Sequence, residues 1–324
     1  MLRCIWLLQL IHQFSLALAM QTNTKGVVVT GATRGIGKSI CQRLLREDPD
    51  PAVRVFLCGR QLDRAREAVE SIMAAMPEAA KGRLEPLLLD VTSEDSVANA
   101  ARQIEAAYGK GSVYALINNA GIALDVPWQP DWQKRADTNA RETVETNVYG
   151  AMRCFRHFRP LMCRGGRVVN VSSGAGMMNV QRMRDNRRRE MLDERMGEEA
   201  FVALVEDFIR CWEGTAAEGR IEMHPERGWW LQTYGFSKAV LNLWTRIIAR
   251  QHSELQINVC TPGFILTGMT EGYEKASTLK TPEEGAKTPV WLAVGDHTHT
   301  GRLFGGEGDE IEWVGYGAGA ARQT

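Results

Sequence analysis

Short apolar runs alternate along the chain with longer segments in which apolar residues recur every three to four positions. The runs are rich in β-branched and aliphatic residues, which is typical of strands buried on both faces, and the longer segments have the period of amphipathic helices. This alternation predicts an α/β fold, a single domain over residues 20–313 whose doubly wound parallel sheet has helices on both faces. The predicted strands are 26–29, 53–58, 84–89, 113–117, 165–171 and 257–260, with a closing edge strand at 301–304.

A glycine-rich turn joins the first strand to the first helical segment. Its sequence is Thr30-Gly31-Ala32-Thr33-Arg34-Gly35-Ile36-Gly37. Gly31 allows a sharp exit from the strand, Gly35 removes a Cβ that would block a diphosphate, and Gly37 lets the helix pack closely on the strand. Because N–H groups at a helix start are unpaired, the turn predicts a dinucleotide site on a Rossmann-type sheet. Its glycine spacing differs from G-x-G-x-x-G, and the alternative is a turn without a ligand.

Polar residues with catalytic potential follow further along the chain. Tyr234 and Lys238 lie one turn apart on the predicted helix 234–250, so they share a face. The strand 165–171 delivers Ser173 to the carboxyl edge of the sheet. The helical segment 138–158 carries Asn147, whose amide is costly to bury unless it is hydrogen-bonded.

Together with Asn118-Asn119-Ala120-Gly121, these motifs in this order resemble the short-chain dehydrogenase/reductase family over residues 25–313. The resemblance implies that Tyr234 gives a proton to a carbonyl, that Ser173 donates to the carbonyl oxygen, and that Asn147 holds a water in the proton path. Lys238 would bind the nicotinamide ribose and, as a nearby ammonium, lower the pKa of the tyrosine. The cofactor-binding residues that it implies are Gly31, Thr33, Arg34, Gly35, Ile36, Gly37, Arg60, Asp90, Val91, Asn118, Ala120, Gly121, Tyr234, Lys238, Pro262, Gly263 and Thr267.

The loop after the second strand favours NADPH/NADP+ over NAD. An NAD-specific site usually carries an acidic residue there to bind the ribose hydroxyls, whereas this chain has Arg60 and no carboxylate before Asp63. The guanidinium of Arg60, joined by that of Arg34 in the glycine turn, suits a 2′-phosphate. The alternative is that both arginines are solvated loop residues.

Residues 174–230 form an insertion between Ser173 and Tyr234, where most members of the family have little more than a loop. Its first part is charged, but interleaved acids indicate a solvated helix face rather than a nucleic-acid patch. Its second part carries an apolar stripe that must be buried. Monomeric carbonyl reductases have such a helix over the surface that other members use to dimerise, so the resemblance implies a monomer. The stripe is Phe201, Leu204, Val205, Phe208 and Trp212.

Apolar side chains near the expected mouth of the site predict an adaptable pocket for bulky or planar ketones, aldehydes or quinones. The pocket residues are Met177, Trp230, Phe264 and Met269, with Met178 and Trp229 close to them. The two tryptophans could equally anchor the insertion. The predicted activity is therefore an NADPH-dependent carbonyl reductase. The alternatives are a dedicated terpenoid, alkaloid or steroid alcohol dehydrogenase and a catalytically silent NADP(H)-binding sensor, which would not need the proton donor.

Composition and charge limit the other classes of function. The 324 residues include 39 basic and 39 acidic side chains, so net charge gives no reason to expect nucleic acid or an anionic membrane as a partner. The seven cysteines show no metal-ligand spacing. They are expected to be reduced, which favours a cytoplasmic protein without a metal site.

The two ends of the chain lie outside the predicted fold. Residues 1–19 contain an apolar stretch that ends in Ala17-Leu18-Ala19, as in a signal peptide. The stretch is too short and too polar for a stable membrane span. It is either a leader, which would direct the protein to the secretory pathway or an organelle, or an unused extension before Met20. The Gly/Ala-rich residues 314–324 are expected to be disordered.

Overall fold

The computed structural model describes residues 24–126, 139–193, 195–215, 223–273 and 279–313. Its centre is a seven-stranded sheet in the order β3-β2-β1-β4-β5-β6-β7, and every neighbouring pair is parallel. The chain order reverses between β1 and β4, so loops from both halves of the sheet meet there. The strands are β1 (Lys25–Val29), β2 (Val53–Gly59), β3 (Leu84–Leu88), β4 (Val113–Asn118), β5 (Met162–Val171), β6 (Gln256–Cys260) and β7 (Leu303–Phe304).

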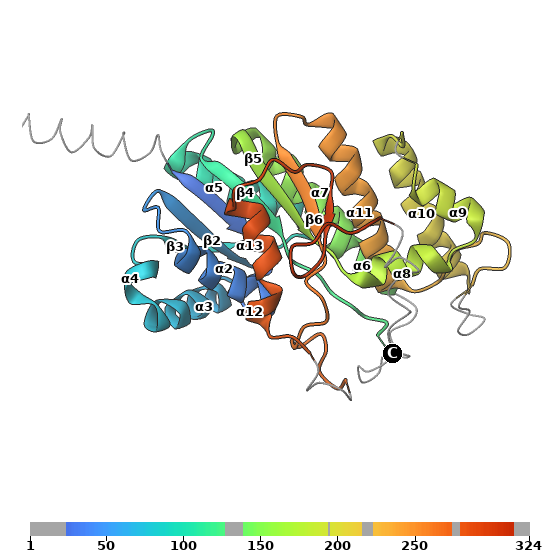
Figure 1. The fold of residues 1–324 in the computed structure, drawn as a ribbon, viewed down its shortest axis with the longest axis horizontal. Helices are drawn as coiled ribbons and strands as arrows, with labels where there is room; N and C mark the ends of the chain where they lie inside the picture. Colours follow the sequence, from blue (N-terminus) through green and yellow to red (C-terminus); the bar gives the residue numbers. More distant parts are fainter. Residues whose placement is uncertain (1–23, 127–138, 194, 216–222, 274–278, 314–324) are drawn as a thin grey trace, which may run out of the picture.

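Helices cover both faces of the sheet (Figure 1). Successive strand residues point to opposite faces, and in β1 the side chain of Val28 joins one buried cluster while Val27 and Val29 join the other. The predicted doubly wound fold is confirmed. The helices are α2 (Gly35–Glu47), α3 (Leu62–Ala75), α4 (Pro77–Ala80), α5 (Glu94–Tyr108), α6 (Asn139–Val144), the π-helix η1 (Glu145–Tyr149), α7 (Gly150–Phe158), the 3-10 helix η2 (Arg159–Leu161), α8 (Gly174–Arg182), α9 (Asp185–Met191), α10 (Glu198–Thr215), α11 (Thr233–Gln251), α12 (Pro282–Gly285) and α13 (Lys287–Val294).

Two predicted helices are interrupted. The segment 138–158 is not one regular helix, because the π-helix η1 separates α6 from α7. The last helix begins at the predicted cap, where Thr281 and Glu284 form a capping box. It breaks after Gly285, since Pro289 has no N–H to donate to the Gly285 carbonyl.

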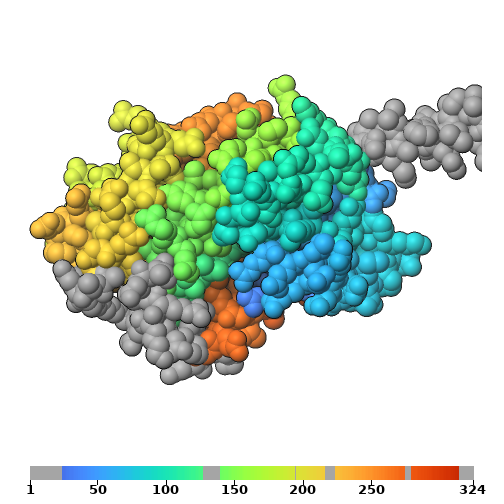
Figure 2. Space-filling model, turned by 180° about the vertical axis from the view of Figure 1, so that it is seen from behind, coloured from blue at the N-terminus to red at the C-terminus, as the bar shows by residue number. Residues whose placement is uncertain are grey.

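The insertion before Tyr234 forms α8, α9 and α10, which lie on the outer side of α11 (Figure 1). Its predicted apolar stripe is confirmed: Phe201 and Phe208 are fully buried, and Trp212 packs against the same cluster. The ring of Phe208 stacks on Phe236 of α11, with centroids 3.5 Å apart. Seen from behind, the insertion (yellow) lies next to the green segment that contains η1 and α7 (Figure 2). Tyr149 of η1 donates a 3.0 Å hydrogen bond to Glu206 of α10.

Replacing Phe208 by Ala is expected to destabilise the protein by about 3 to 5 kcal/mol, because it leaves a cavity between α10 and α11. Val202→Ala on the exposed face of the same helix is the control, with an expected change within about 0.5 kcal/mol. Denaturant unfolding measures both. Equal effects of the two substitutions would show that the stripe does not hold the insertion to the domain.

The predictions for residues 1–19 and 314–324 fall outside the described residues. Among the helices that the structure describes, none combines the length and the apolar character needed to cross a membrane.

Candidate active site

The glycine turn has the geometry that its sequence predicts. Gly31 and Gly35 have φ of +62° and +55°, in the left-handed region that favours glycine. A Cβ at Gly31 would lie 2.8 Å from the Cα of Ala120, and one at Gly35 would lie 3.3 Å from the side chain of Thr267. The turn is thus enclosed by loops that follow β4 and β6, both of which were predicted to bind the cofactor.

Two residues at the ends of β1 and β4, Thr30 and Asn119, hold this turn in place. The side-chain amide of Asn119 donates to the carbonyl oxygens of Thr30 and Gly31, at 2.9 and 3.2 Å. In return, the Thr30 hydroxyl accepts the backbone N–H groups of Asn119 and Ala120, both at 3.0 Å. The end of β1 is therefore tied to the end of β4, next to the point where the sheet order reverses.

Arg34 and Arg60 lie on the edge where a 2′-phosphate is expected. β2 ends against the glycine turn, because a Cβ at Gly59 would come within 2.5 Å of the Thr33 side chain. Arg60 follows directly and is exposed, as is Arg34, whose guanidinium lies beside Gly268. Among the described residues, neither arginine forms an ion pair.

Other predicted cofactor residues carry structural contacts as well. Asp90 accepts hydrogen bonds from the backbone N–H and the hydroxyl of Thr92, at 3.0 and 2.8 Å. Val91 is buried in the turn after β3. Asn118 donates to Asn170 at 2.9 Å, in a buried bond that joins β4 to β5. The remaining predicted residues, Ile36, Gly37, Gly121, Pro262 and Gly263, lie at the same carboxyl edge of the sheet.

Tyr234, Lys238 and Asn147 come together beside Gly121. The ammonium of Lys238 is buried, donates to the carbonyl of Val171 at 2.9 Å and lies 5.9 Å from the centre of the Tyr234 ring. A Cβ at Gly121 would lie 3.4 Å from this nitrogen and 3.2 Å from Oδ1 of Asn147. A Cβ at this position would be in close contact with both side chains.

Asn147 is the middle residue of the π-helix η1, a local widening that often marks functional sites. Its Oδ1 accepts the N–H of Ile122 at 2.8 Å, and its Nδ2 donates to the carbonyl of Ile122 and to the hydroxyl of Ser237, both at 2.9 Å. Because Ser237 donates to the carbonyl of Tyr234 at 2.7 Å, the asparagine is connected to the helix of the predicted proton donor.

The structure separates the roles of the two adjacent serines at the end of β5. Ser172 is buried and its hydroxyl donates to the carbonyl of Lys238 at 3.3 Å, so it braces α11. Ser173 caps α8, where its hydroxyl accepts the N–H of Ala175 at 3.2 Å, and it also hydrogen-bonds the phenol of Tyr234. The second serine is therefore the one that faces the tyrosine.

Burial dominates the pKa values of Tyr234 and Lys238 in the ligand-free protein. Burial raises the pKa of Tyr234 above its ordinary value, and the hydrogen bond with Ser173 offsets this only in part. In the ligand-free protein the ammonium of Lys238 is bonded to the carbonyl of Val171. Burial lowers the pKa of Lys238 to about 8. Tyr234 thus stays protonated at neutral pH, as a proton donor must.

The buried Lys238 predicts a pH dependence of stability. Its pKa is about 8 in the folded protein against an ordinary value of 10.5, so the unfolded chain binds more protons between these pH values. Its contribution to the unfolding free energy therefore rises with pH across this window, by as much as about 3 kcal/mol. Unfolding of the ligand-free wild type and of Lys238→Met, measured from pH 7 to 10.5, should show this difference. If the unfolding free energies of the two proteins changed in parallel with pH, the predicted contribution of Lys238 would be contradicted.

The predicted substrate residues divide into two groups. Met177 is 1% exposed and packs with Val259 and Leu303, so its side chain lies in the core rather than at the surface. α8 turns this side chain toward the sheet, while the next residue, Met178, is 49% exposed. Phe264 is exposed and meets Tyr273 edge-to-face, with centroids 4.8 Å apart.

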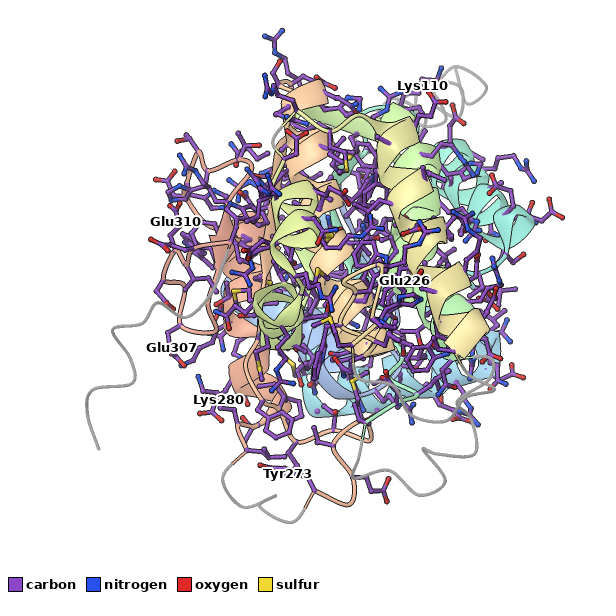
Figure 3. All side chains as sticks on the ribbon, turned by 90° about the vertical axis from the view of Figure 1, so that its right-hand side faces the viewer. Lys110, Glu226, Tyr273, Lys280, Glu307 and Glu310 are labelled. Atoms are coloured by element: carbon purple, nitrogen blue, oxygen red, sulfur yellow. The ribbon has the colours of Figure 1, made fainter. Side chains whose placement is uncertain are left out.

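The other two pocket residues are partly buried. Trp230 packs against the buried cluster that also contains Phe201 and Phe208, and the Arg182 guanidinium lies 5.0 Å from its ring centre. Met269 lies on the segment after β6, which continues to Tyr273. Figure 3 shows Tyr273 and Lys280 near each other at the bottom of the view. Lys280 pairs with Glu307.

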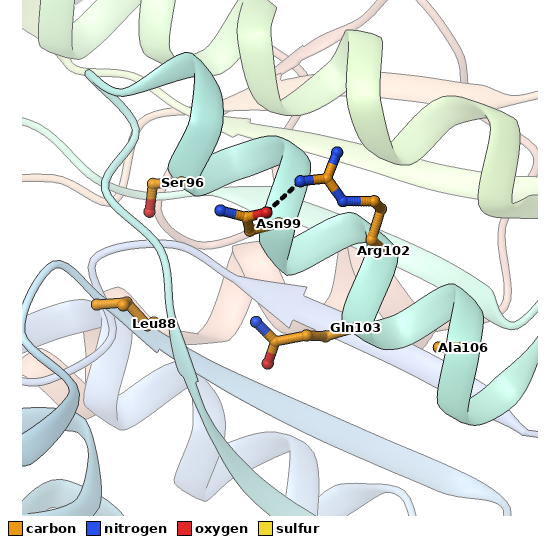
Figure 4. Close-up of a pocket in the computed structure, with 6 residues that line it drawn as sticks. All are labelled: Leu88, Ser96, Asn99, Arg102, Gln103 and Ala106. Carbon is orange, nitrogen blue, oxygen red and sulfur yellow. Dashed lines mark hydrogen bonds between the residues drawn. The ribbon is translucent and has the colours of Figure 1, made fainter.

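A separate surface hollow of about 360 Å³ lies between β3 and α5. It contains none of the candidate catalytic residues, and within it Arg102 bonds to Asn99 (Figure 4). Across the described residues, no group of three His, Cys, Asp or Glu side chains is arranged to hold a metal ion.

Comparison with known proteins decides the family. The model of the family described as short chain dehydrogenase matches residues 25–184. Carbonyl reductase (NADPH) 1 of Mus musculus is 31% identical over 281 residues, which are 85% of this chain and 92% of that protein. The chain belongs to the short-chain dehydrogenase family. The resemblance and the Rossmann-type fold expected from the sequence are both confirmed, and the protein is a member of an oxidoreductase family.

Plant members of the short-chain dehydrogenase family are equally similar. Short-chain dehydrogenase/reductase 1 of Saponaria officinalis is 34% identical over 289 residues, which are 82% of this chain and 89% of that protein. The solved structure of salutaridine reductase from Papaver somniferum superposes with a TM-score of 0.70 at 25% identity, covering 86% of this chain and 99% of that one.

Proposed function

We propose that this short-chain dehydrogenase is an NADPH-dependent carbonyl reductase that converts ketones, aldehydes or quinones to alcohols. The observation that carries the proposal is the convergence of Tyr234, Lys238, Ser173 and Asn147 at the sheet edge that bears the glycine turn. A protein that only binds the nucleotide has no need for a proton donor in this position.

The residues present fit NADP(H). The turn around Gly31 and Gly35 provides a cradle that a Cβ would fill, and the exposed guanidiniums of Arg34 and Arg60 suit a 2′-phosphate. Asp90 and Val91 would border the adenine. Asn118, Ala120, Gly121 and Lys238 would line the ribose next to the nicotinamide, and Pro262, Gly263 and Thr267 would line the nicotinamide end. The cofactor supplies a hydride when it is bound.

The chain's own residues would orient and protonate the substrate. The hydroxyl of Ser173 accepts the N–H of Ala175, and in the complex its proton would turn from the Tyr234 phenol to the carbonyl oxygen of the substrate. The phenol of Tyr234 gives the proton that converts the developing oxyanion to an alcohol. The ammonium of Lys238 then stabilises the phenolate until a proton returns, and Asn147 would hold the water through which it comes.

Mus musculus carbonyl reductase supports the general assignment, while the likeness to salutaridine reductase favours a dedicated alcohol dehydrogenase as a second candidate. NADPH oxidation with a panel of aromatic aldehydes, quinones and cyclic ketones separates the two. A general reductase turns over several classes, and a dedicated enzyme turns over one. Cofactor binding without turnover of any carbonyl would favour the sensor.

The insertion supports a monomer, since α10 packs over the outer side of α11 through Phe208 and Phe236. Light scattering should give the mass of one chain. A stable dimer would show that the insertion does not block association.

A further inference from the structure

The first turn of α11 is held by a carboxylate from another part of the chain. Asp125 is 8% exposed, and its two oxygens accept the backbone N–H groups of Thr233 and Tyr234, the latter at 3.2 Å. These groups have no partner within the helix. The helix's own cap, Gln232, accepts the N–H of Gly235 at 3.0 Å and does not reach them. A carboxylate at this end also suits the helix dipole.

Asp125 ends a segment that touches each part of the candidate site. Asn119 binds the glycine turn, Ile122 is held on both backbone groups by Asn147, and the carbonyl of Leu124 accepts from Asn139 at 3.3 Å. The segment 119–125 thus begins at the glycine turn, passes the π-helix η1 and ends at Asp125, which binds the first turn of α11.

The charge of Asp125 also acts on the phenol. It adds to burial in raising the pKa of Tyr234. Burial also raises the pKa of Asp125 itself, and the hydrogen bonds that its carboxylate accepts offset this only in part. The groups around the phenol are Ser173 at the start of α8, Lys238 on α11 and Asp125 on the segment after β4, and Cys260 of β6 lies behind the lysine. Burial is the larger cause of the raised pKa of the phenol, and among these groups Asp125 is the one whose negative charge adds to it.

We propose that Asp125 is a positioning residue, which fixes Tyr234 through the backbone of α11 and couples it to the segment that holds the cofactor turn. The proposal rests on the function of Tyr234 as proton donor. It assigns a role to a residue outside the motifs of the sequence analysis.

The test compares Asp125→Asn, which removes the charge and keeps one acceptor, with Asp125→Ala, which removes both acceptors. We expect kcat to fall about tenfold for the amide and about a hundredfold for alanine, with KM and NADPH affinity within about twofold, because a small misplacement of a reacting group is costly. Asp48→Ala, which removes a carboxylate that accepts the N–H of Asp50 far from the site, should leave kcat unchanged.

A second readout does not depend on activity. Phenolate absorbance of the ligand-free protein, from which the curve of Tyr234→Phe is subtracted, gives the titration of Tyr234 alone. In Asp125→Asn this step should move to lower pH, because a negative charge near the phenol has been removed. If alanine prevents folding, the amide variant carries the whole test.

An unchanged kcat and an unchanged titration in Asp125→Asn would overturn the proposal. The proposal would also be overturned if kcat, NADPH affinity and melting temperature all fell together while the titration of Tyr234 stayed at its wild-type pH. That pattern would indicate a purely structural role. Failure of the proposed function looks different: Tyr234→Phe would then keep wild-type activity, whatever the Asp125 variants do.

Discussion

Replacement of Tyr234 by Phe is expected to lower kcat for carbonyl reduction about a thousandfold while NADPH still binds. The substitution removes the hydroxyl that hydrogen-bonds Ser173 and keeps the ring, so the packing of α11 is preserved. Burial holds the pKa of this tyrosine above its ordinary value, and the proton is therefore present at neutral pH. Stopped-flow NADPH oxidation and cofactor fluorescence measure the rate and the binding.

Tyr108→Phe is the matched control, since it removes a hydroxyl that bonds Glu85 at the far edge of the sheet. Its kcat should equal that of the wild type. Equal rates for the wild type and Tyr234→Phe would remove the proposed proton donor.

Removing both Arg34 and Arg60 is expected to weaken NADPH binding about a hundredfold and to leave NADH binding nearly unchanged, because hydrogen bonds to a charged phosphate contribute about 1.5 to 3 kcal/mol each. Both guanidiniums lie exposed at the ends of β1 and β2, and neither has an ion-pair partner among the described residues. Dissociation constants for the two nucleotides, measured by fluorescence, give the selectivity directly.

Arg66→Ala is the control for this pair, since Arg66 is exposed on α3 and bonds to Asp63. It should leave both affinities unchanged. A wild-type preference for NADH that persists in Arg60→Ala would refute the 2′-phosphate assignment.

Local patterns were enough to predict the sheet and to select the candidate catalytic groups. The apolar runs are continuous because parallel strands are buried on both faces, and Val27, Val28 and Val29 show this directly. Tyr234 and Lys238 meet because their spacing is one helical turn, and the glycine turn needs residues that accept positive φ. These features depend on neighbours in sequence.

Long-range contacts were not predictable in the same way. Asp125 reaches Tyr234 across 109 positions, and no spacing rule connects a carboxylate in a loop to the start of a distant helix. Met177 and Met178 are adjacent, and only the rotation of α8 after its Ser173 cap decides which is buried. The raised pKa of Tyr234 likewise depends on burial, which charge spacing in the sequence does not give.

The central claim is that the phenol of Tyr234 and the ammonium of Lys238 act together on a carbonyl next to the nicotinamide. A crystal structure of the complex with NADP+ tests it most directly. The account predicts the diphosphate on the glycine turn, the ammonium at the nicotinamide ribose, and the phenol beside Ser173 and facing the ring. A complex in which both side chains turn away from the nicotinamide would contradict it.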